Sequence, residues 1–381
     1  VNSQGLIETV NANVPRLDYP FINGVVQDCP HLLLEPQRTN LLTYSEDFTQ
    51  WNTLRGTLNV NNITSPTGSL NGGLYTKTES GNEGYVFRDL TVSSVGTYTA
   101  SVFFKYNNNQ YVHFLLWDGS SNGVRCYFDI QNGNVGSAVA FGTTFSASDL
   151  SMEDYGNGWY KCSAKFTTTG TDTIWQFRFS PSGGNNSSNS NTGAKFYFFG
   201  AQIEQGSYPT SYISTNGSSV TRLKDECFNG GNADLFNDIE GTLFVDLENF
   251  DTTSTELTLS SGSSSNRITF LFYGSAFGVP NKIRFYLASA GSAQVDSLYN
   301  ISYTFNQRNK IAFKYKQNDF KIYINGTQVF SDTSGNTPIG LSRFDFASFD
   351  ATSGFIEGKI NQAMVFNEAL SDSELQTLTT L

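Results

Sequence analysis

Short alternating runs dominate the chain from Tyr85 onward. Stretches such as YVFRDLTV, YVHFLLW, VRCYFDI and TIWQFRFS place apolar residues at every second position, and turns rich in Gly, Asn and Ser separate them. A period of two is typical of a strand with one buried face, and turns at this spacing favour antiparallel neighbours. The first set of runs therefore predicts a sandwich of seven or eight short strands.

A second set of alternating runs follows in the C-terminal part, including RITFLFY, KIAFKYK and FKIYINGTQVF. In the last of these, Asn325-Gly326 separates two runs and predicts a tight hairpin. Ser371 and Glu374 form a capping-box pattern that predicts a helix start. The expected fold class is all-β: two antiparallel β-sandwich (jelly-roll) domains in series, with an extended N-terminal strap and a short C-terminal helix.

The N-terminal residues show no sustained period. Pro15, Pro20, Pro30 and Pro36 disfavour a long helix or a central strand there, while the leucines at 32–34 need burial. These residues are therefore expected to lie as a strap against a folded surface. The stretch STNGSSVTRLKDE has the composition of a domain boundary. The expected organisation is a strap at 1–40, a first jelly roll at 41–215, a linker at 216–236 and a second jelly roll at 237–381.

Charge and hydropathy narrow the range of partners. The 381 residues carry a net charge of −11 and no cluster of Lys and Arg. This argues against nucleic acid and against an anionic membrane surface as partners. No run of 18 apolar residues is present, so no membrane-spanning helix is expected. The chain begins with Val and shows no signal-peptide pattern, so we expect a piece of a longer protein or a processed product.

Four cysteines are too few for a disulfide scaffold. Cys126 and Cys162 alternate in phase with apolar neighbours, which predicts two buried thiols. Cys29 and Cys227 lie in the segments that flank the first domain, and a disulfide between them would tie the strap to the linker. The sequence leaves open whether these two residues meet.

Residues for catalysis are sparse. The chain has only two histidines, which excludes a metal site of several histidines, and it lacks a nucleophile elbow. Asp246-x-Glu248-x-x-Asp251 is similar to the E-x-D-x-x-E strand of laminarinase-type hydrolases, but its acids are exchanged; a solvated polar strand face is the other interpretation. We expect no enzyme, although a lyase constellation could be drawn from Tyr111, His113, Arg125 and Tyr127.

One predicted sheet face of the first sandwich gathers aromatic and polar residues. In the strands around 111–117, 124–130 and 174–179 these residues alternate with apolar ones and so share the side away from the core. Aromatic rings stack on the CH faces of sugars, and polar groups recognise hydroxyls. The alternative is that this face packs on the second domain, a neighbouring protomer or the strap. The predicted carbohydrate-binding residues are Tyr111, His113, Trp117, Arg125, Tyr127, Gln176 and Arg178.

No cofactor is required by this interpretation. Binding modules of the jelly-roll type often hold a structural calcium ion, and Glu46 and Asp47 at the start of the first sandwich are the candidate ligands. The chain has no D-x-D-x-D loop to support them.

Several motifs resemble those of known proteins. PRLDY and LLLEPQRTNLLTYSEDFTQW resemble the leading segment of bacteriophage tail, fibre and other virion-decorating proteins, especially from phages of the Bacteroidetes. DYGNGWYKCSAKF and FFGAQIEQGSYPTSYISTNGSSVTR are similar to the later part of the carbohydrate-binding-module-like jelly roll that follows this segment. The C-terminal part, from NKIAFKYK to LSDSELQTL, resembles a laminin-G-like, concanavalin A-type jelly roll. In such proteins the strap can close the open edge of the first sandwich.

The resemblance implies a non-enzymatic protein of the virion surface, made in the cytoplasm of the bacterial host: a fibre, tail-tip or head-decoration component. Its expected partners are a host surface polysaccharide and, through the N-terminal segment, other virion proteins. A homo-oligomer is expected, with a trimer as the predicted order. Two alternatives stay open: a purely structural decoration protein, and a polysaccharide-degrading enzyme or its carbohydrate-binding module. Fold alone does not decide between them.

Overall fold

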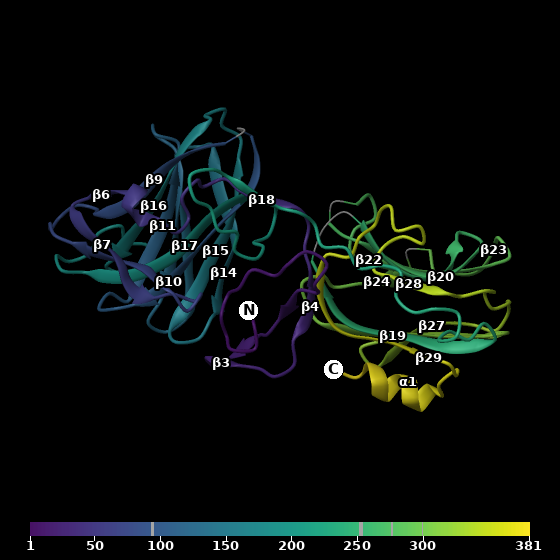
Figure 1. Cartoon of the computed structure of the whole chain (residues 1–381). Helices are drawn as coiled ribbons and strands as arrows, with labels where there is room; N and C mark the ends of the chain where they lie inside the picture. Colours follow the sequence, from purple (N-terminus) through teal and green to yellow (C-terminus); the bar gives the residue numbers. More distant parts are fainter. Residues whose placement is uncertain (93–94, 251–253, 276, 299) are drawn as a thin grey trace. The chain divides into compact units, whose positions relative to one another are not determined.

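The computed structural model describes the chain except for residues 93–94, 251–253, 276 and 299. Nearly all regular structure in the described part is antiparallel strand, with one short 3₁₀ turn at Phe48–Gln50 and one α-helix, α1 (Asp372–Thr379), close to the C-terminus (Figure 1). The predicted all-β fold with a short terminal helix is confirmed.

The described residues form two compact units, and the N-terminal residues contribute to both of them. We call these the first unit and the second unit. The first unit contains residues 1–9, 19–29 and 37–223, and the second unit contains residues 10–18, 30–36 and 224–381.

The first unit is a sandwich of two antiparallel sheets. The order of one sheet is β14 (Phe145–Asp154), β15 (Trp159–Thr168), β10 (Gly96–Tyr106), β17 (Lys195–Gln205), β8 (Leu70–Lys77), β7 (Gly56–Thr64). The order of the other is β13 (Asn134–Phe141), β12 (Gly123–Asp129), β11 (Tyr111–Trp117), β16 (Ile174–Ser182), β9 (Tyr85–Thr91), β6 (Asn52–Leu54). Short pairs add β2 (Phe21–Ile22) with β3 (Val25–Val26) and β5 (Arg38–Asn40) with β18 (Val220–Arg222).

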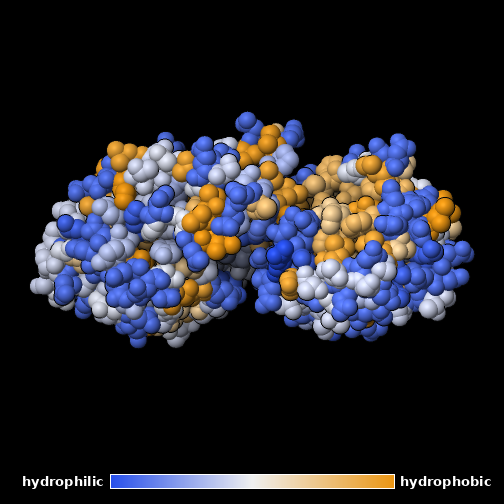
Figure 2. Space-filling model, turned by 90° about the horizontal axis from the view of Figure 1, so that it is seen from below, coloured by the Kyte–Doolittle hydropathy of each residue, from blue (hydrophilic) through white to orange (hydrophobic). Residues whose placement is uncertain are grey.

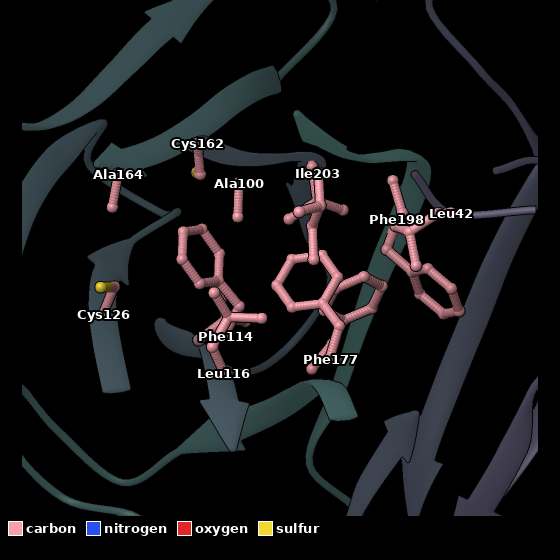
Figure 3. Packing of buried hydrophobic residues seen from close by; sticks show 14 of the residues in the cluster. Leu42, Ala100, Phe114, Leu116, Cys126, Cys162, Ala164, Phe177, Phe198 and Ile203 are labelled. Carbon is pink, nitrogen blue, oxygen red and sulfur yellow. The ribbon is translucent and has the colours of Figure 1, made fainter. Parts of the chain in front are cut away.

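Alternating side chains of both sheets fill the core of the first unit. Phe114 and Leu116 of β11 pack with Phe177 of β16 and with Phe198 and Ile203 of β17 (Figure 3). The predicted buried thiols are confirmed, because the side chains of two cysteines lie in this core. These are Cys126 and Cys162.

The second unit is also a sandwich. The order of one sheet is β1 (Leu17–Asp18), β4 (His31–Leu34), β29 (Gly358–Phe366), β19 (Glu240–Asn249), β25 (Asn309–Lys316), β26 (Asp319–Ile324), β27 (Thr327–Asp332). The other consists of β23 (Ser292–Asp296), β22 (Lys282–Ser289), β21 (Asn266–Tyr273), β20 (Ser254–Ser263) and β28 (Arg343–Asp345), with β24 (Ile301–Ser302) paired to β22.

Two local sequence signals have the predicted structure. Asn325 and Gly326 take φ values of 50° and 78° between β26 and β27, as a tight hairpin turn of this sequence requires. Ser371 and Glu374 form both hydrogen bonds of the capping box at α1. Leu375 of this helix is fully buried against the outer side of the β19 sheet, so the helix covers apolar residues there.

The leucines of the strap occupy a different place from the one predicted. Leu32, Leu33 and Leu34 belong to β4, which pairs with β29 in the second unit, and the Leu34 side chain lies in the core of that unit. The expectation that this stretch closes the first sandwich is therefore wrong. The pairing satisfies an edge of β29 that would otherwise be exposed, and it buries apolar side chains at the same time.

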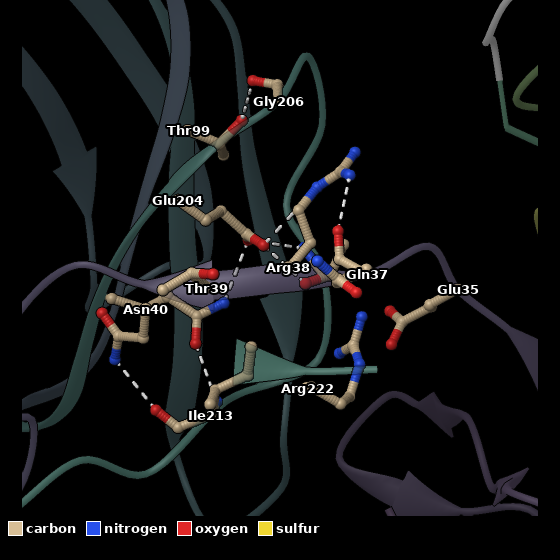
Figure 4. Close-up of polar contacts among 12 residues, drawn as sticks. Glu35, Gln37, Arg38, Thr39, Asn40, Thr99, Glu204, Gly206, Ile213 and Arg222 are labelled. Carbon is tan, nitrogen blue, oxygen red and sulfur yellow. Dashed lines mark hydrogen bonds and ion pairs between the residues drawn. The ribbon is translucent and has the colours of Figure 1, made fainter. Parts of the chain in front are cut away.

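The following residues attach to the first unit, and Asn40 of β5 contributes several of the hydrogen bonds. The Asn40 amide nitrogen donates to the carbonyl of Ile213 at 2.9 Å (Figure 4) and to that of Ala201 at 3.2 Å. The Asn40 amide oxygen accepts from the backbone N–H of Leu42 and Ile203. Asn40 is fully buried, so this one side chain satisfies four backbone groups that have lost water. The TNLL stretch is thus a structural anchor.

Candidate functional site

The seven predicted binding residues do lie on one side of one sheet. They come from β11, β12 and β16, which are neighbours, and the register places Tyr127 beside His113, and Gln176 beside Trp117. Between Arg125 and Arg178 lies Leu115, which is almost completely buried. We call this side of the sheet the outer face.

Burial divides these residues into two groups. His113 and Tyr127 are 0% and 2% exposed, and their rings pack against each other with centroids 5.0 Å apart. The prediction that they bind a ligand directly is therefore wrong for this structure, because neither side chain is accessible. The other members are half-buried and keep accessible surface: Tyr111, Trp117, Arg125, Gln176 and Arg178.

Glu83 explains why His113 is buried. It precedes β9, and its carboxylate lies over the outer face. Oε1 accepts hydrogen bonds from His113 Nε2 at 2.8 Å and from Ser180 Oγ at 3.3 Å, while Oε2 lies 3.0 Å from Arg125 Nη2. One carboxylate of the chain thus joins three strands of the sheet.

The charges of this cluster follow from its burial. Burial lowers the pKa of His113, and the nearby Arg125 lowers it further, against the opposing effect of Glu83. His113 is therefore neutral at pH 7, and its Nε2–H donates to the carboxylate. Burial alone would raise the pKa of Glu83, but the hydrogen bond from His113 and the charge of Arg125 outweigh it, so the pKa is lowered and the carboxylate is ionised.

Arg178 lies between two aromatic rings. Its guanidinium carbon is 4.2 Å from the ring centroid of Trp117 and 4.4 Å from that of Tyr85, which are cation–π distances. Its Nε donates to the Gln176 side-chain oxygen, and Gln176 Nε2 donates to Asp89 Oδ1 at 2.8 Å. Rings and hydrogen bonds together fix the plane of the guanidinium.

Three residues of this site were missed by the sequence interpretation: Glu83, Tyr85 and Asp89. The run YVFRDLTV does contain the signal, since Tyr85 and Asp89 share one parity of β9. The pairing of β9 with β16 is what brings them beside Gln176 and Arg178, and it joins strands that are far apart in the sequence. Glu83 precedes its strand and carries no pattern at all.

The outer face can hold a sugar ring as far as its chemistry is concerned. Trp117 and Tyr111 offer half-exposed aromatic rings, and the Trp117 indole is fixed by a hydrogen bond from Nε1 to the Ser120 carbonyl at 3.3 Å. Arg178 and Gln176 add hydrogen-bonding groups beside these rings. An aromatic surface next to oriented polar groups is the usual composition of a carbohydrate site.

The predicted calcium ligands are engaged with protein groups. Glu46 accepts from Asn71 Nδ2 at 3.0 Å and from the Tyr212 hydroxyl at 3.1 Å. Asp47 accepts from the backbone N–H and the hydroxyl of Thr49. Within the described residues no group of three or more His, Cys, Asp or Glu side chains could hold a metal ion. The calcium site stays a prediction.

The predicted disulfide is not formed. Cys29 and Cys227 are both free thiols; Cys29 is exposed after the β2–β3 pair, whereas Cys227 packs against the core of the second unit. Burial raises the pKa of the Cys227 thiol, which disfavours the thiolate needed for disulfide exchange.

The carboxylates of the hydrolase-like pattern have structural partners. Asp246 is 1% exposed and accepts a bidentate pair of hydrogen bonds from Arg308 at 2.8 and 2.6 Å, with a third from Asn361 at 3.0 Å. Glu248 follows on the same strand, and Asp251 lies outside the described residues. An acid held in this way is a poor proton donor or nucleophile.

Part of the chain matches a known protein family. Residues 242–376 match the family described as the concanavalin A-like lectin/glucanases superfamily. The predicted laminin-G-like, concanavalin A-type jelly roll is confirmed for these residues. No curated protein matches the chain. None of the helices in the described residues is long and apolar enough to cross a membrane.

Similar solved structures include carbohydrate-binding proteins. The CBM40 of the Ruminococcus gnavus IT-sialidase has 14% identity and a TM-score of 0.33, with 41% of this chain and 96% of that chain covered. Domain 4 of an extracellular arabinanase from Geobacillus stearothermophilus, in complex with arabinotriose, has 18% identity and a TM-score of 0.33, with 46% and 81% covered. Sheep galectin-11 has 8% identity and a TM-score of 0.27, with 38% and 100% covered. These scores are too low to support an argument about function.

Proposed function

We propose that the chain is a non-enzymatic glycan-binding protein and that the outer face of the first unit is its binding surface. The observation that carries this proposal is the row formed by Trp117, Arg178 and Tyr85, where accessible aromatic rings flank an oriented guanidinium. A sugar would stack on the half-exposed rings and receive hydrogen bonds from the neighbouring polar groups. The lectin-type family match of residues 242–376 supports the same class of ligand.

We further propose that the protein belongs to a virion surface, as a fibre, tail-tip or head-decoration component. The resemblance of the strap motifs to phage adhesion proteins supports this location. The ligand would then be a host surface polysaccharide, and many weak sites on one virion would give strong attachment. Antibodies against the purified chain provide a test: they should label intact virions and block their adsorption to host cells, and a lack of labelling would contradict this location.

Assembly into a homo-oligomer, with a trimer as the proposed order, fits the exposed apolar residues. Phe228, Leu235 and Ile239 of the second unit are 48%, 54% and 74% exposed, and Figure 2 shows hydrophobic residues interspersed with hydrophilic ones over the surface in view. Contacts between copies would bury such residues. Light scattering of the purified chain gives its mass directly, and a monomer at all concentrations would contradict the proposal.

The decisive experiment is binding of the purified chain to a glycan array and to host-type cells. Trp117→Ala should reduce binding about twofold to tenfold, because it removes an aromatic platform whose stacking contributes on the order of 0.5–1.5 kcal/mol. Tyr286→Ala is a matched control, since Tyr286 also lies beside arginines but belongs to the second unit.

Equal binding of wild type and Trp117→Ala would place the glycan site elsewhere. A complete lack of binding by a folded, oligomeric chain would favour the purely structural decoration protein instead. Release of oligosaccharides from a polysaccharide, measured by mass spectrometry, would contradict the non-enzymatic assignment.

A further inference from the structure

Arg178 is fixed in position, yet its terminal amino groups have no protein acceptor in the described part of the chain. The guanidinium lies between Trp117 and Tyr85, and its hydrogen bond to Gln176 uses Nε alone. Nη1 and Nη2 therefore keep their donors for a ligand, while the rings hold the plane in which these donors point. An arginine oriented in this way loses little conformational entropy when it binds.

The second arginine of the outer face, Arg125, binds a carboxylate. Arg125 is 3.0 Å from the Glu83 carboxylate, which His113 and Ser180 also contact. The outer face thus already holds one carboxylate, and that carboxylate belongs to the chain itself. Arg178, on the other side of Leu115, has no carboxylate partner of this kind among the described residues.

We propose that Arg178 recognises the carboxylate of an acidic sugar, and that the outer face is therefore specific for carboxylate-bearing glycans. This inference rests on the proposed glycan-binding function and names its ligand class. The planar guanidinium matches a planar carboxylate through two parallel hydrogen bonds. Trp117, which lies directly against Arg178, would contact the ring of the same sugar residue.

The local charges permit an anionic ligand despite the acidic chain. The net charge is −11, and Glu83 and Asp89 both lie near Arg178. Glu83 is paired with Arg125, and the Asp89 carboxylate contacts Gln176. Because Arg178 is half-buried, its interaction with a carboxylate is screened less than in water. One ionic contact predicts only a modest decrease of affinity with salt.

Matched pairs of glycans test the ligand class. Polygalacturonate, hyaluronate and polysialic acid would be compared with their carboxyl-reduced forms, which keep the sugar backbone and lose the charge. Dextran sulfate would test the other common anionic group, and dextran is the neutral control. We expect binding to at least one carboxylated glycan and at least a tenfold loss of affinity when its carboxyl groups are reduced.

Variants at Arg178 test the residue. Arg178→Gln should lower affinity for the carboxylated glycan at least tenfold, and Arg178→Lys about threefold to tenfold, since lysine keeps the charge but loses the planar pair of donors. Arg267→Gln is the control, because Arg267 lies 5.0 Å from the ring centroids of both Tyr286 and Phe349 in the second unit. It should bind like wild type, and thermal unfolding should show that all variants are folded.

The outcomes separate the inference from the proposed function. Trp117-dependent binding to neutral glycans, with no effect of Arg178→Lys or Arg178→Gln, would overturn the inference and leave the proposed function intact. Preference for dextran sulfate over every carboxylated glycan would also overturn it. Equal losses in Arg178→Gln and Arg267→Gln would show non-specific charge attraction and overturn it as well. No binding to any glycan would overturn both.

Discussion

The two units are both antiparallel sandwiches, but they use polar side chains differently. In the second unit, three arginines each form a bidentate pair with one aspartate: Arg284 with Asp296, Arg308 with Asp246, and Arg343 with Asp345. In the first unit, Glu83 and Asn40 each contact several groups from different strands.

The difference indicates which polar groups belong to the fold and which are left for a ligand. An arginine with a bidentate carboxylate partner has its charge compensated and two of its five N–H donors satisfied. Arg178 has its plane fixed by rings and Gln176 but keeps two amino groups for another acceptor. Arg267 of the second unit also lies beside two rings, so what favours the first unit as the proposed site is the hydrogen bond from Arg178 to Gln176, although the family match covers residues 242–376 of the second unit.

The largest effect is expected from Asn40→Ala. It removes the hydrogen-bond partners of four buried backbone groups, each worth about 1 kcal/mol or more, so the free energy of unfolding of the first unit should fall by about 3–4 kcal/mol. Chemical denaturation with a probe of the first unit measures it. Asn361→Ala in the second unit removes one hydrogen bond and should cost about 1 kcal/mol. Equal decreases in the free energy of unfolding for Asn40→Ala and Asn361→Ala would contradict this difference between the two units.

A smaller effect is expected from Asp246→Asn. The change removes the charge that Arg308 and Asn361 contact and should lower the free energy of unfolding of the second unit by about 2 kcal/mol. The value is below that for a fully buried pair because Arg308 is 55% exposed. Glycan binding should stay at the wild-type level. A loss of binding in the folded variant would move the site to the second unit.

The smallest effect is a pH dependence from His113. Its pKa is lowered in the folded state, so the unfolded chain binds a proton below about pH 6.5 that the folded chain does not. Stability should therefore fall as the pH drops below 6.5, by on the order of 1 kcal/mol per pH unit at most. The lowered pKa of Glu83 adds nothing in this window, since its contribution is lost only below its ordinary value of 4.5.

Urea unfolding of wild type and His113→Gln at pH 6.5 and 5.5 would measure this term. His31→Gln is the control from the second unit, because the pKa of His31 is also lowered by burial. The decrease in the free energy of unfolding of the first unit between pH 6.5 and 5.5 should become smaller only in His113→Gln. An unchanged slope would show that His113 is protonated in the folded state.

Local patterns predicted much of this molecule. Period-two alternation gave the strands, the shared side of β11, β12 and β16, and the buried Cys126 and Cys162, since these depend only on neighbours in sequence. The Asn325-Gly326 turn and the cap at Ser371 are local for the same reason.

The predictions that were wrong concern residues whose contacts are distant in the sequence. The sequence pattern predicts that His113 is a surface residue, but Glu83 covers it in the structure. No sequence pattern predicts the position of a single glutamate that precedes a strand. Leu34 is predicted to be buried, but the sequence does not show in which of the two cores its side chain packs. A disulfide between Cys29 and Cys227 was compatible with the sequence, because the sequence does not show which residues surround them.

The way the first 36 residues alternate between the units has a consequence for inheritance. Residues 10–18 and 30–36 complete the second unit, although most of that unit is encoded more than 180 codons later. A recombination event that exchanged only the C-terminal sandwich would separate β29 from β4 and Leu34 from its core. An exchanged C-terminal sandwich would keep this edge strand and this core side chain only if the matching N-terminal segment came with it.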